Sequence, residues 1–463
     1  MQRISRRSFL AGSAAWAATP VLASAQSSEV FEVLVVGAGA AGIAAARKLA
    51  AAGKKFTVVE AADRIGGRCI TDTTLFGAPY DLGAHWIHLP QTNPVAQLAA
   101  HTGLNVYPAP RGQTVRIGRR NARMGELEYF LAAVVRSNRA IAETARGKRD
   151  MSCLRALPDD LGEWRETISF MLGPFQSTRD LGEISAVDFA RSAERNADAF
   201  CRQGLGALVA KLATGLPVQL GNPVRRIEWG GRRAIEVVTA QGRLIAQAVI
   251  VTASTGVLNA GKIAFNPELP KRPREALSQL PLGSYDHIML ELPGNPLNLQ
   301  SDELVFEKSL STRTGAILAN IGGSNVCMVD VGGSFGRALS ARGEQAMVSF
   351  ALDWLASLYG DEVTKLFKRT HATRWNHEPW ILGAASVAEP GGGGARQALM
   401  EPLRDRVFFA GEAIHETLWG TVGGAWQSGE RAAEAVIKSM AEPPAQHRRK
   451  KPARRRRRRR RKQ

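Results

Sequence analysis

The chain has 463 residues, of which 44% are hydrophobic and 22% are charged, and its formal net charge at pH 7 is +19. That length is enough for two domains with a substantial core, and no segment after residue 25 has the roughly 18 continuous apolar residues of a membrane-spanning helix. The 4 cysteines are scattered without a C-x-x-C pair and no H-E-x-x-H motif occurs, so neither a disulfide framework nor a metal site is expected.

The N-terminal residues have the features of an export signal. The run S-R-R-S-F-L at 5–10 is a twin-arginine signature, a mildly apolar segment follows at 10–22, and A-S-A at 23–25 provides a cleavage site. The apolar segment is too short and too rich in alanine, glycine and serine to span a membrane well. We therefore expect residues 1–25 to be a twin-arginine signal peptide. The mature protein, which would begin at Gln26, is then periplasmic or secreted.

The next predicted elements form a βαβ turn that binds a dinucleotide. An apolar run at 33–36 predicts a strand, the alanine-rich segment 43–52 a helix, and residues 55–60 a second strand that ends in Glu60. Three glycines with the spacing G-x-G-x-x-G precede the helix: Gly37, Gly39 and Gly42. In that order they permit a tight turn, the approach of the backbone to a pyrophosphate, and close packing of helix on strand. Glu60 lies at the distance from which an acid binds a ribose 2′-hydroxyl.

Later elements follow along the chain. Composition and periodicity predict helices at 123–148 and 198–212, strands at 235–239 and 244–252, and an amphipathic helix at 346–359. A buried strand at 407–409 precedes a glycine-rich turn at 420–425 and a helix that begins near Gly423. The N-terminus of that helix predicts a second site for an anion or a polar ring.

Most of the positive charge lies at the C-terminal end. Residues 448–462 carry 13 basic residues and the signal carries 3, and removing these from +19 leaves +3 for the remaining chain. An unbroken arginine run cannot bury a core, so we expect residues 442–463 to be a disordered poly-Arg tail. The tail would bind anionic surfaces or polyanions in a salt-sensitive manner, or be a solvated appendage without a defined partner. No nucleic-acid-binding fold accompanies it, so specific nucleic-acid recognition is not expected.

Several motifs together resemble one family. They are G-A-G-A-A-G at 37–42, E-A-x-x-R-I-G-G-R at 60–68, D-L-G-A-H-W-I-H at 81–88, F-A-G-E at 409–412 and G-T-V-x-G-A at 420–425. In this order they resemble the flavin-containing amine oxidases, and most closely the polyamine oxidases. The resemblance implies an α/β fold, with a Rossmann-like FAD-binding domain of the glutathione-reductase type and a discontinuous α+β substrate domain. The implied FAD-binding segments are 26–105, 200–285 and 395–441, and the implied substrate-domain segments are 106–199 and 286–394.

The resemblance also implies roles for individual residues. Gly37, Gly39 and Gly42 would hold the pyrophosphate of FAD, and Glu60 the adenosine ribose. The other implied cofactor contacts are Arg68 at the flavin phosphates, Val224 at the adenine, Glu412 at the ribityl–phosphate portion, and Thr421 and Val422 at the isoalloxazine ring. His85, Trp86 and His88 would lie on the active-site side of the flavin, and we expect Trp86 and His88 to face the substrate.

Three positions depart from the family pattern. The family usually has a lysine four residues after the glycine of an L-P-x-G motif, where it holds a water near the flavin; here that residue is His287. We expect the imidazole of His287 to hold this water in place of the lysine. Because imidazole titrates near neutral pH, reoxidation would be slower or more pH-dependent. Ala385 stands where an aromatic residue is expected, and Trp380 or Trp419 would have to replace it. Ala384 stands where monoamine oxidases have the cysteine that binds flavin covalently, so non-covalent FAD is expected.

The resemblance therefore implies an FAD-dependent oxidase of amines, with polyamines as one substrate class. Hydride transfer to the flavin N5 would give an imine, and oxygen would then give peroxide. An L-amino-acid oxidase, a flavin dehydrogenase with another acceptor, and a degenerate non-catalytic flavoprotein stay open as alternatives. The acidic residues expected for polyamine recognition have candidates whose spacing is more typical of a solvated helix face: Asp159, Asp160, Glu163 and Glu166.

Overall fold

The computed structural model describes residues 30–110, 112–192 and 197–441, so the predicted signal and tail lie outside the described residues. Its largest sheet has eight strands. In spatial order these are β10 (Val218–Gln219), β2 (Phe56–Val59), β1 (Val30–Val36), β13 (Gly242–Val251), β12 (Ile235–Thr239), β11 (Val224–Glu228) and β14 (Ala264–Asn266), with β20 (Val407–Phe409) paired to β13. The central strands β2, β1, β13 and β20 run parallel.

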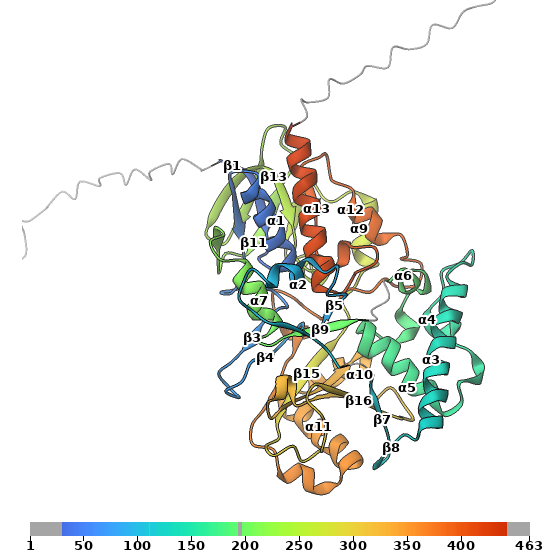
Figure 1. The fold of residues 1–463 in the computed structure, drawn as a ribbon. Coiled ribbons are helices and arrows are strands. Elements are labelled where there is room, and N and C mark those ends of the chain that lie inside the picture. The colour runs from blue at the N-terminus through green and yellow to red at the C-terminus, as the bar shows by residue number, and fades with distance from the viewer. Residues whose placement is uncertain (1–29, 111, 193–196, 442–463) are drawn as a thin grey trace, which may run out of the picture.

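Both faces of this sheet are covered, as is typical of parallel strands. Alternate side chains of β1 point to opposite faces, so that Val33 and Val35 join one hydrophobic core while Leu34 and Val36 join another. The first core contains α1 (Ala40–Ala51) and α13 (Val422–Ala441), which lie side by side in Figure 1. The second contains residues of three helices: α8 (Thr255–Asn259), α9 (Lys271–Ser278) and α12 (Ala395–Met400).

Small residues let α1 and α13 approach closely. A Cβ atom added to Gly429 of α13 would lie 2.0 Å from the carbonyl oxygen of Ala41 in α1. Any larger residue there would push the helices apart. This contact fixes the N-terminal ends of both helices at the same edge of the sheet, where the predicted dinucleotide turn lies.

A second sheet of seven strands forms the other end of the molecule (Figure 1). Its order is β19 (Thr370–Ala372), β15 (Tyr285–Glu291), β18 (Val326–Gly332), β17 (Ala316–Ala319), β16 (Glu303–Glu307), β7 (Thr114–Ile117) and β8 (Arg120–Asn121). Helices α10 (Gly333–Ala341) and α11 (Glu344–Tyr359) pack against it through a core that includes Ile288, Leu290 and Leu355. The chain therefore crosses between the two sheets several times.

The remaining elements connect the two sheets or flank them. Small sheets pair β3 (Thr71–Asp72) with β4 (Tyr80–Asp81), and β5 (Ile87–His88) with β9 (Asp198–Cys201) and β6 (Val106–Pro108). The helices α3 (Met124–Thr144), α4 (Cys153–Ala156), α5 (Arg165–Phe170) and α6 (Ala186–Arg191) form a separate group on the right of Figure 1. The other two helices are α2 (Pro94–Ala99) and α7 (Leu205–Leu212).

Most of the predicted elements are confirmed, and one is wrong. The structure has helices within 123–148 and over 344–359, and strands at 235–239 and 242–251. Residues 198–212, predicted as one helix, form strand β9 and helix α7 instead. Strand pairing to β5 and β6 outweighs the local propensity at 198–201, and Gly204, with φ of +94°, makes the turn between the two elements. The segment boundaries between the implied domains stay a prediction.

None of the helices in the described part of the chain combines the length and the hydrophobicity needed to cross a bilayer.

Candidate active site

One cavity of about 1680 Å³ runs from the edge of the first sheet to the second sheet. It is larger than an ordinary small-ligand pocket of about 300–1,000 Å³. Eleven of the twelve predicted site residues line it: Gly37, Gly39, Glu60, Arg68, Trp86, His88, Val224, His287, Glu412, Thr421 and Val422. The twelfth, Gly42, lies behind the cavity wall. The structure thus brings together residues from six separate stretches of the sequence, between Gly37 and Val422.

The phosphate end of the cavity is formed by the turn between β1 and α1. Gly37 has φ of +101°, which favours glycine, and a Cβ atom on Gly42 would lie 1.9 Å from the Gly37 carbonyl oxygen. Gly39 differs from both, because a Cβ there would find its nearest neighbours 4.0 Å away. The fold therefore leaves room in front of Gly39, at the N-terminus of a 12-residue helix. That space suits the pyrophosphate of a dinucleotide.

Glu60 follows β2 at the same end of the cavity. Its carboxylate accepts hydrogen bonds from the backbone N–H groups of Ala38 at 2.7 Å and Ala62 at 2.9 Å. These two bonds hold the carboxylate beside the glycine turn, and each oxygen keeps a lone pair for a further donor. Val224, at the start of β11, also lines this end. The arrangement fits the adenosine half of FAD.

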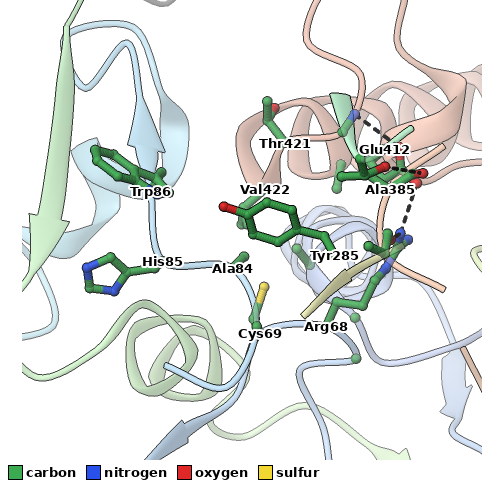
Figure 2. A pocket seen from close by; sticks show the side chains of 18 of the residues that line it. Arg68, Cys69, Ala84, His85, Trp86, Tyr285, Ala385, Glu412, Thr421 and Val422 are labelled. Atoms are coloured by element: carbon green, nitrogen blue, oxygen red, sulfur yellow. Dashed lines mark hydrogen bonds and ion pairs between the residues drawn. The ribbon is translucent and has the colours of Figure 1, made fainter. Parts of the chain in front are cut away.

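An ion pair between the partly exposed Arg68 and the buried Glu412 also lines the cavity (Figure 2). Arg68 Nη1 lies 3.0 Å from Glu412 Oε1, and Ser386 donates to Glu412 through its backbone N–H at 3.1 Å and its hydroxyl at 2.7 Å. The Gly420 N–H donates at 3.0 Å. Burial disfavours the charged form of Glu412, but the charges of Arg68 and Arg396 outweigh it and hold the pKa of that carboxyl below its usual range. Arg68 keeps further N–H donors that can bind phosphate.

Thr421 and Val422 lie at the N-terminus of α13, a helix of 20 residues. The Thr421 hydroxyl accepts the Gly424 N–H at 2.9 Å and donates to the Leu418 carbonyl at 2.7 Å, so it acts as the helix cap. Val422 presents an apolar side chain to the cavity (Figure 2). This helix end offers partial positive charge and an apolar surface together, which fits a polar aromatic ring.

The segment 81–88 contributes three aromatic residues with different surroundings. His85 lines the cavity but is only 4% exposed; it packs on Phe200 with ring centroids 4.5 Å apart, and its Nδ1 lies 2.9 Å from Asp81, so its contacts are mainly structural. Trp86 also packs on Phe200, with ring centroids 4.7 Å apart, and lines the cavity. His88 lines the cavity with its Nδ1 2.7 Å from the Asp198 carboxylate. Of the three, Trp86 and His88 are positioned to meet a substrate.

His287 also lines the cavity, but both of its ring nitrogens already have protein partners. Nδ1 lies 2.5 Å from Asp330 Oδ1, and Nε2 lies 2.8 Å from the carbonyl oxygen of Gly83. Neither nitrogen is therefore free to hold a water without breaking one of these bonds. The water-holding role of His287 stays a prediction, and the geometry favours a positioning role.

Sequence reasoning missed several cavity residues. Asp198 and Asp302 line the cavity, whereas the four carboxylates proposed from the sequence do not. The Asp302 carboxylate accepts the Tyr107 hydroxyl at 3.0 Å. Tyr285 lines the cavity close to His287. The sequence could have indicated this, because residues two apart on a strand lie on the same face. No feature of the sequence indicated Asp330, which lies opposite His287 on β18.

The two tryptophans considered as replacements for an aromatic residue at position 385 have different surroundings. Trp380 lines the cavity and is 40% exposed, with Lys262 Nζ 5.2 Å from its ring centroid. Trp419 is buried, and the Arg396 guanidinium lies 4.8 Å from its ring centroid. Trp380 is thus the better placed of the two to meet a ligand.

Comparison with known proteins gives a consistent result. Residues 40–185 and 183–437 match the family described as flavin-containing amine oxidoreductase. Lysine-specific histone demethylase 2 of Homo sapiens is 27% identical over 442 residues, which cover 87% of this chain and 53% of that protein. Probable polyamine oxidase 4 of Arabidopsis thaliana is 27% identical over 432 residues, covering 87% of this chain and 86% of that protein. The chain thus spans about half the length of the demethylase but most of the polyamine oxidase.

Solved structures with the same fold include two amine oxidases. Cyclohexylamine oxidase from Brevibacterium oxydans IH-35A superposes with a TM-score of 0.77 at 21% identity, covering 89% of this chain and 100% of that one. Putrescine oxidase bound to putrescine gives a TM-score of 0.76 at 21% identity, covering 89% and 99%. At this identity the likeness establishes the fold, and the predicted α/β architecture with an FAD-binding domain and a substrate domain is confirmed.

Proposed function

The chain belongs to the family of flavin-containing amine oxidoreductases, and on this basis we propose that it is an FAD-dependent oxidase of amines. FAD, held by the glycine turn, Glu60 and Arg68, would supply the hydride acceptor for the carbon next to the amine nitrogen and the electrons for oxygen, so that an imine and hydrogen peroxide would form. The protein would bind the cofactor, orient the amine and exclude water.

The observation that carries the proposal is a single cavity with two kinds of lining. At one end are the glycine turn, Glu60 and the Arg68–Glu412 pair, which suit a dinucleotide. At the other end are aromatic and acidic side chains, among them Trp86 and Asp198. Because the two ends are continuous, a bound amine and the flavin ring would meet between them.

The acidic lining favours a substrate with more than one amino group. Asp198, in β9, and Asp302, immediately before β16, both line the cavity, and a carboxylate there would attract a distal ammonium group. We therefore propose diamines or polyamines as the substrate class, with His88 and Trp86 in contact with the chain of the substrate.

We further propose that FAD is held without a covalent bond. Ala384 and Ala385 offer no nucleophile, and Cys69, which also lines the cavity, is buried. Burial raises the pKa of the Cys69 thiol to about 12, so the thiolate that a covalent bond requires is not formed at neutral pH. Denaturation in acid followed by filtration should release all of the flavin.

Anaerobic mixing of the purified protein with amines tests the proposal. The panel contains putrescine, spermidine, spermine, cyclohexylamine and benzylamine, with L-amino acids as a comparison, and the visible flavin spectrum is followed before air is admitted. Bleaching by an amine, with peroxide formed on reoxidation, supports an amine oxidase. Bleaching that air does not reverse would indicate a dehydrogenase. A bound flavin that no amine bleaches would refute the proposed activity.

Export through the twin-arginine route and anion binding by the poly-Arg tail are also proposals, supported only by residues outside the described part of the chain. Replacing Arg6 and Arg7 by lysine should retain the protein in the cytoplasmic fraction, whereas an unchanged periplasmic fraction would refute the export signal. Deleting residues 447–463 should abolish salt-sensitive binding to anionic vesicles. Binding that depends on neither the tail nor salt would refute its role.

A further inference from the structure

Three titratable side chains of the second sheet meet at the wall of the cavity. Tyr285 and His287 lie two residues apart on β15 and therefore on the same face, and His287 pairs with Asp330 on the antiparallel neighbour β18. Asp330 Oδ1 lies 2.5 Å from His287 Nδ1, and Asp330 Oδ2 accepts the Tyr285 hydroxyl at 2.8 Å. One fully buried carboxylate thus binds both neighbours.

The partners of His287 indicate that it carries a proton on each nitrogen. The Gly83 carbonyl can only accept, so Nε2 must donate to it, while Nδ1 faces a carboxylate. The titratable groups on the same face as His287 are Asp330 on β18 and Tyr285 on β15; Asp286, next to it on β15, points to the other face, but its charge also raises the pKa of His287. Burial disfavours the charged imidazole, but Asp330 outweighs it and holds the pKa of His287 above its usual value. A buried imidazolium–carboxylate pair results.

The same pair determines the hydrogen bonding of Tyr285. Because the phenol donates its proton to Asp330, the lone pairs of its oxygen remain for a donor in the cavity. Figure 2 shows the ring reaching into the cavity between Ala84 and Val422. Burial, followed by the charge of Asp330, raises the pKa of Tyr285 well above its usual value, so the group stays a neutral phenol.

We propose that Tyr285 Oη is the hydrogen-bond acceptor for the amine nitrogen of the substrate, and that Asp330 and His287 are positioning residues that keep the phenol proton turned toward Asp330. The inference rests on the proposed amine oxidase function and extends it to the group that recognises the amine. A substrate must then offer an N–H donor at this point. A group that can only accept hydrogen bonds, such as a carboxylate, would find no partner at Tyr285.

The first test is the variant Tyr285→Phe, which keeps the ring and removes the oxygen. Its control is Tyr359→Phe, because Tyr359 packs on Arg116 and does not line the cavity. The flavin of each protein is reduced anaerobically with putrescine, cyclohexylamine and benzylamine, and the apparent Kd and the limiting rate are measured. The loss of one hydrogen bond should raise the Kd of Tyr285→Phe about ten-fold, with unchanged reoxidation by air. The control should match the wild type.

The outcomes separate this inference from the proposed function. If amines bleach the wild-type flavin but Tyr285→Phe keeps its Kd within about two-fold for each of them, the inference is refuted and the function stands. If no amine bleaches the wild-type flavin, both the inference about Tyr285 and the proposed function are refuted.

A second test needs no substrate. In protein labelled with ¹⁵N-histidine, the two ring nitrogens of His287, assigned by their loss in His287→Gln, should show the shifts of an imidazolium at pH 8. In Asp330→Asn they should show those of a neutral imidazole, whereas a merely structural histidine would be neutral in both proteins. Neutral shifts in the wild type would overturn the proposed unit.

Discussion

Replacing Gly42 by alanine should separate helix α1 from the glycine turn that it supports. The added Cβ would lie 1.9 Å from the Gly37 carbonyl oxygen, whereas real Cβ contacts are not shorter than 3.0 Å, so the two must move apart by at least 1.1 Å. The contacted oxygen belongs to the backbone of Gly37, so it cannot rotate away as a flexible side chain would. Overpacking of this kind destabilises a fold by about 1–3 kcal/mol.

The same displacement should weaken cofactor binding. The N-terminal N–H groups of α1 face the space in front of Gly39, and moving them by an ångström would lengthen their hydrogen bonds to a pyrophosphate. Losing one charge-assisted bond of about 1.5–3 kcal/mol corresponds to a Kd for FAD that is at least about ten-fold higher. Titration of the apoprotein with FAD, followed by flavin fluorescence, measures this Kd. Thermal unfolding of the apoprotein measures stability.

Gly125 provides a matched control. It also lies in the first turn of a helix, α3, but a Cβ atom added there would meet nothing within 4 Å. Gly125→Ala should therefore raise the unfolding temperature slightly, because alanine favours helix by about 1 kcal/mol, and should leave the Kd for FAD unchanged. If Gly42→Ala binds FAD like the wild type and unfolds at the same temperature, the packing argument is refuted.

Three further changes have defined expectations. Glu412→Gln should lower the unfolding temperature at pH 7 by leaving Arg68 without its counter-charge. Because the folded pKa of Glu412 is lowered, its contribution is present above the ordinary carboxylate pKa and is lost as the pH falls through the folded value. The variant should thus lose less stability on acidification than the wild type. An equal loss of stability in the two proteins as the pH falls would contradict this. Asp188→Asn should cost about 3 kcal/mol of folding free energy, because it removes the carboxylate that pairs with the buried Arg396 at 2.8 Å. An unchanged unfolding temperature would refute that, and the flavin spectrum should not change. Asp302→Asn should raise the Kd for putrescine several-fold more than that for benzylamine, which has no second amino group; equal effects would remove Asp302 from distal amine recognition.

The sequence by itself determined the dinucleotide end of this protein. The glycine spacing, the alanine-rich helix and Glu60 lie within one βαβ unit, and the geometry of such a unit depends on which residues permit tight turns and close backbone contact. Local sequence expresses those requirements directly. The F-A-G-E motif before α13 was readable for the same reason, and Arg68 and Glu412, predicted separately, are joined at 3.0 Å.

Only the tertiary structure decided which side chains meet at the other end of the cavity, near β9, β15 and β18. Asp330 lies 43 residues from His287, and their contact depends on the register of β15 against β18, which no spacing in the sequence encodes. That contact changes the interpretation of His287 from a freely titrating imidazole that holds water to a doubly bonded residue. Likewise, Asp198 reached the cavity because β9 pairs between β5 and β6, although its local sequence favoured a helix. Long-range strand pairing, which overrides local propensity, determines which side chains line this part of the cavity.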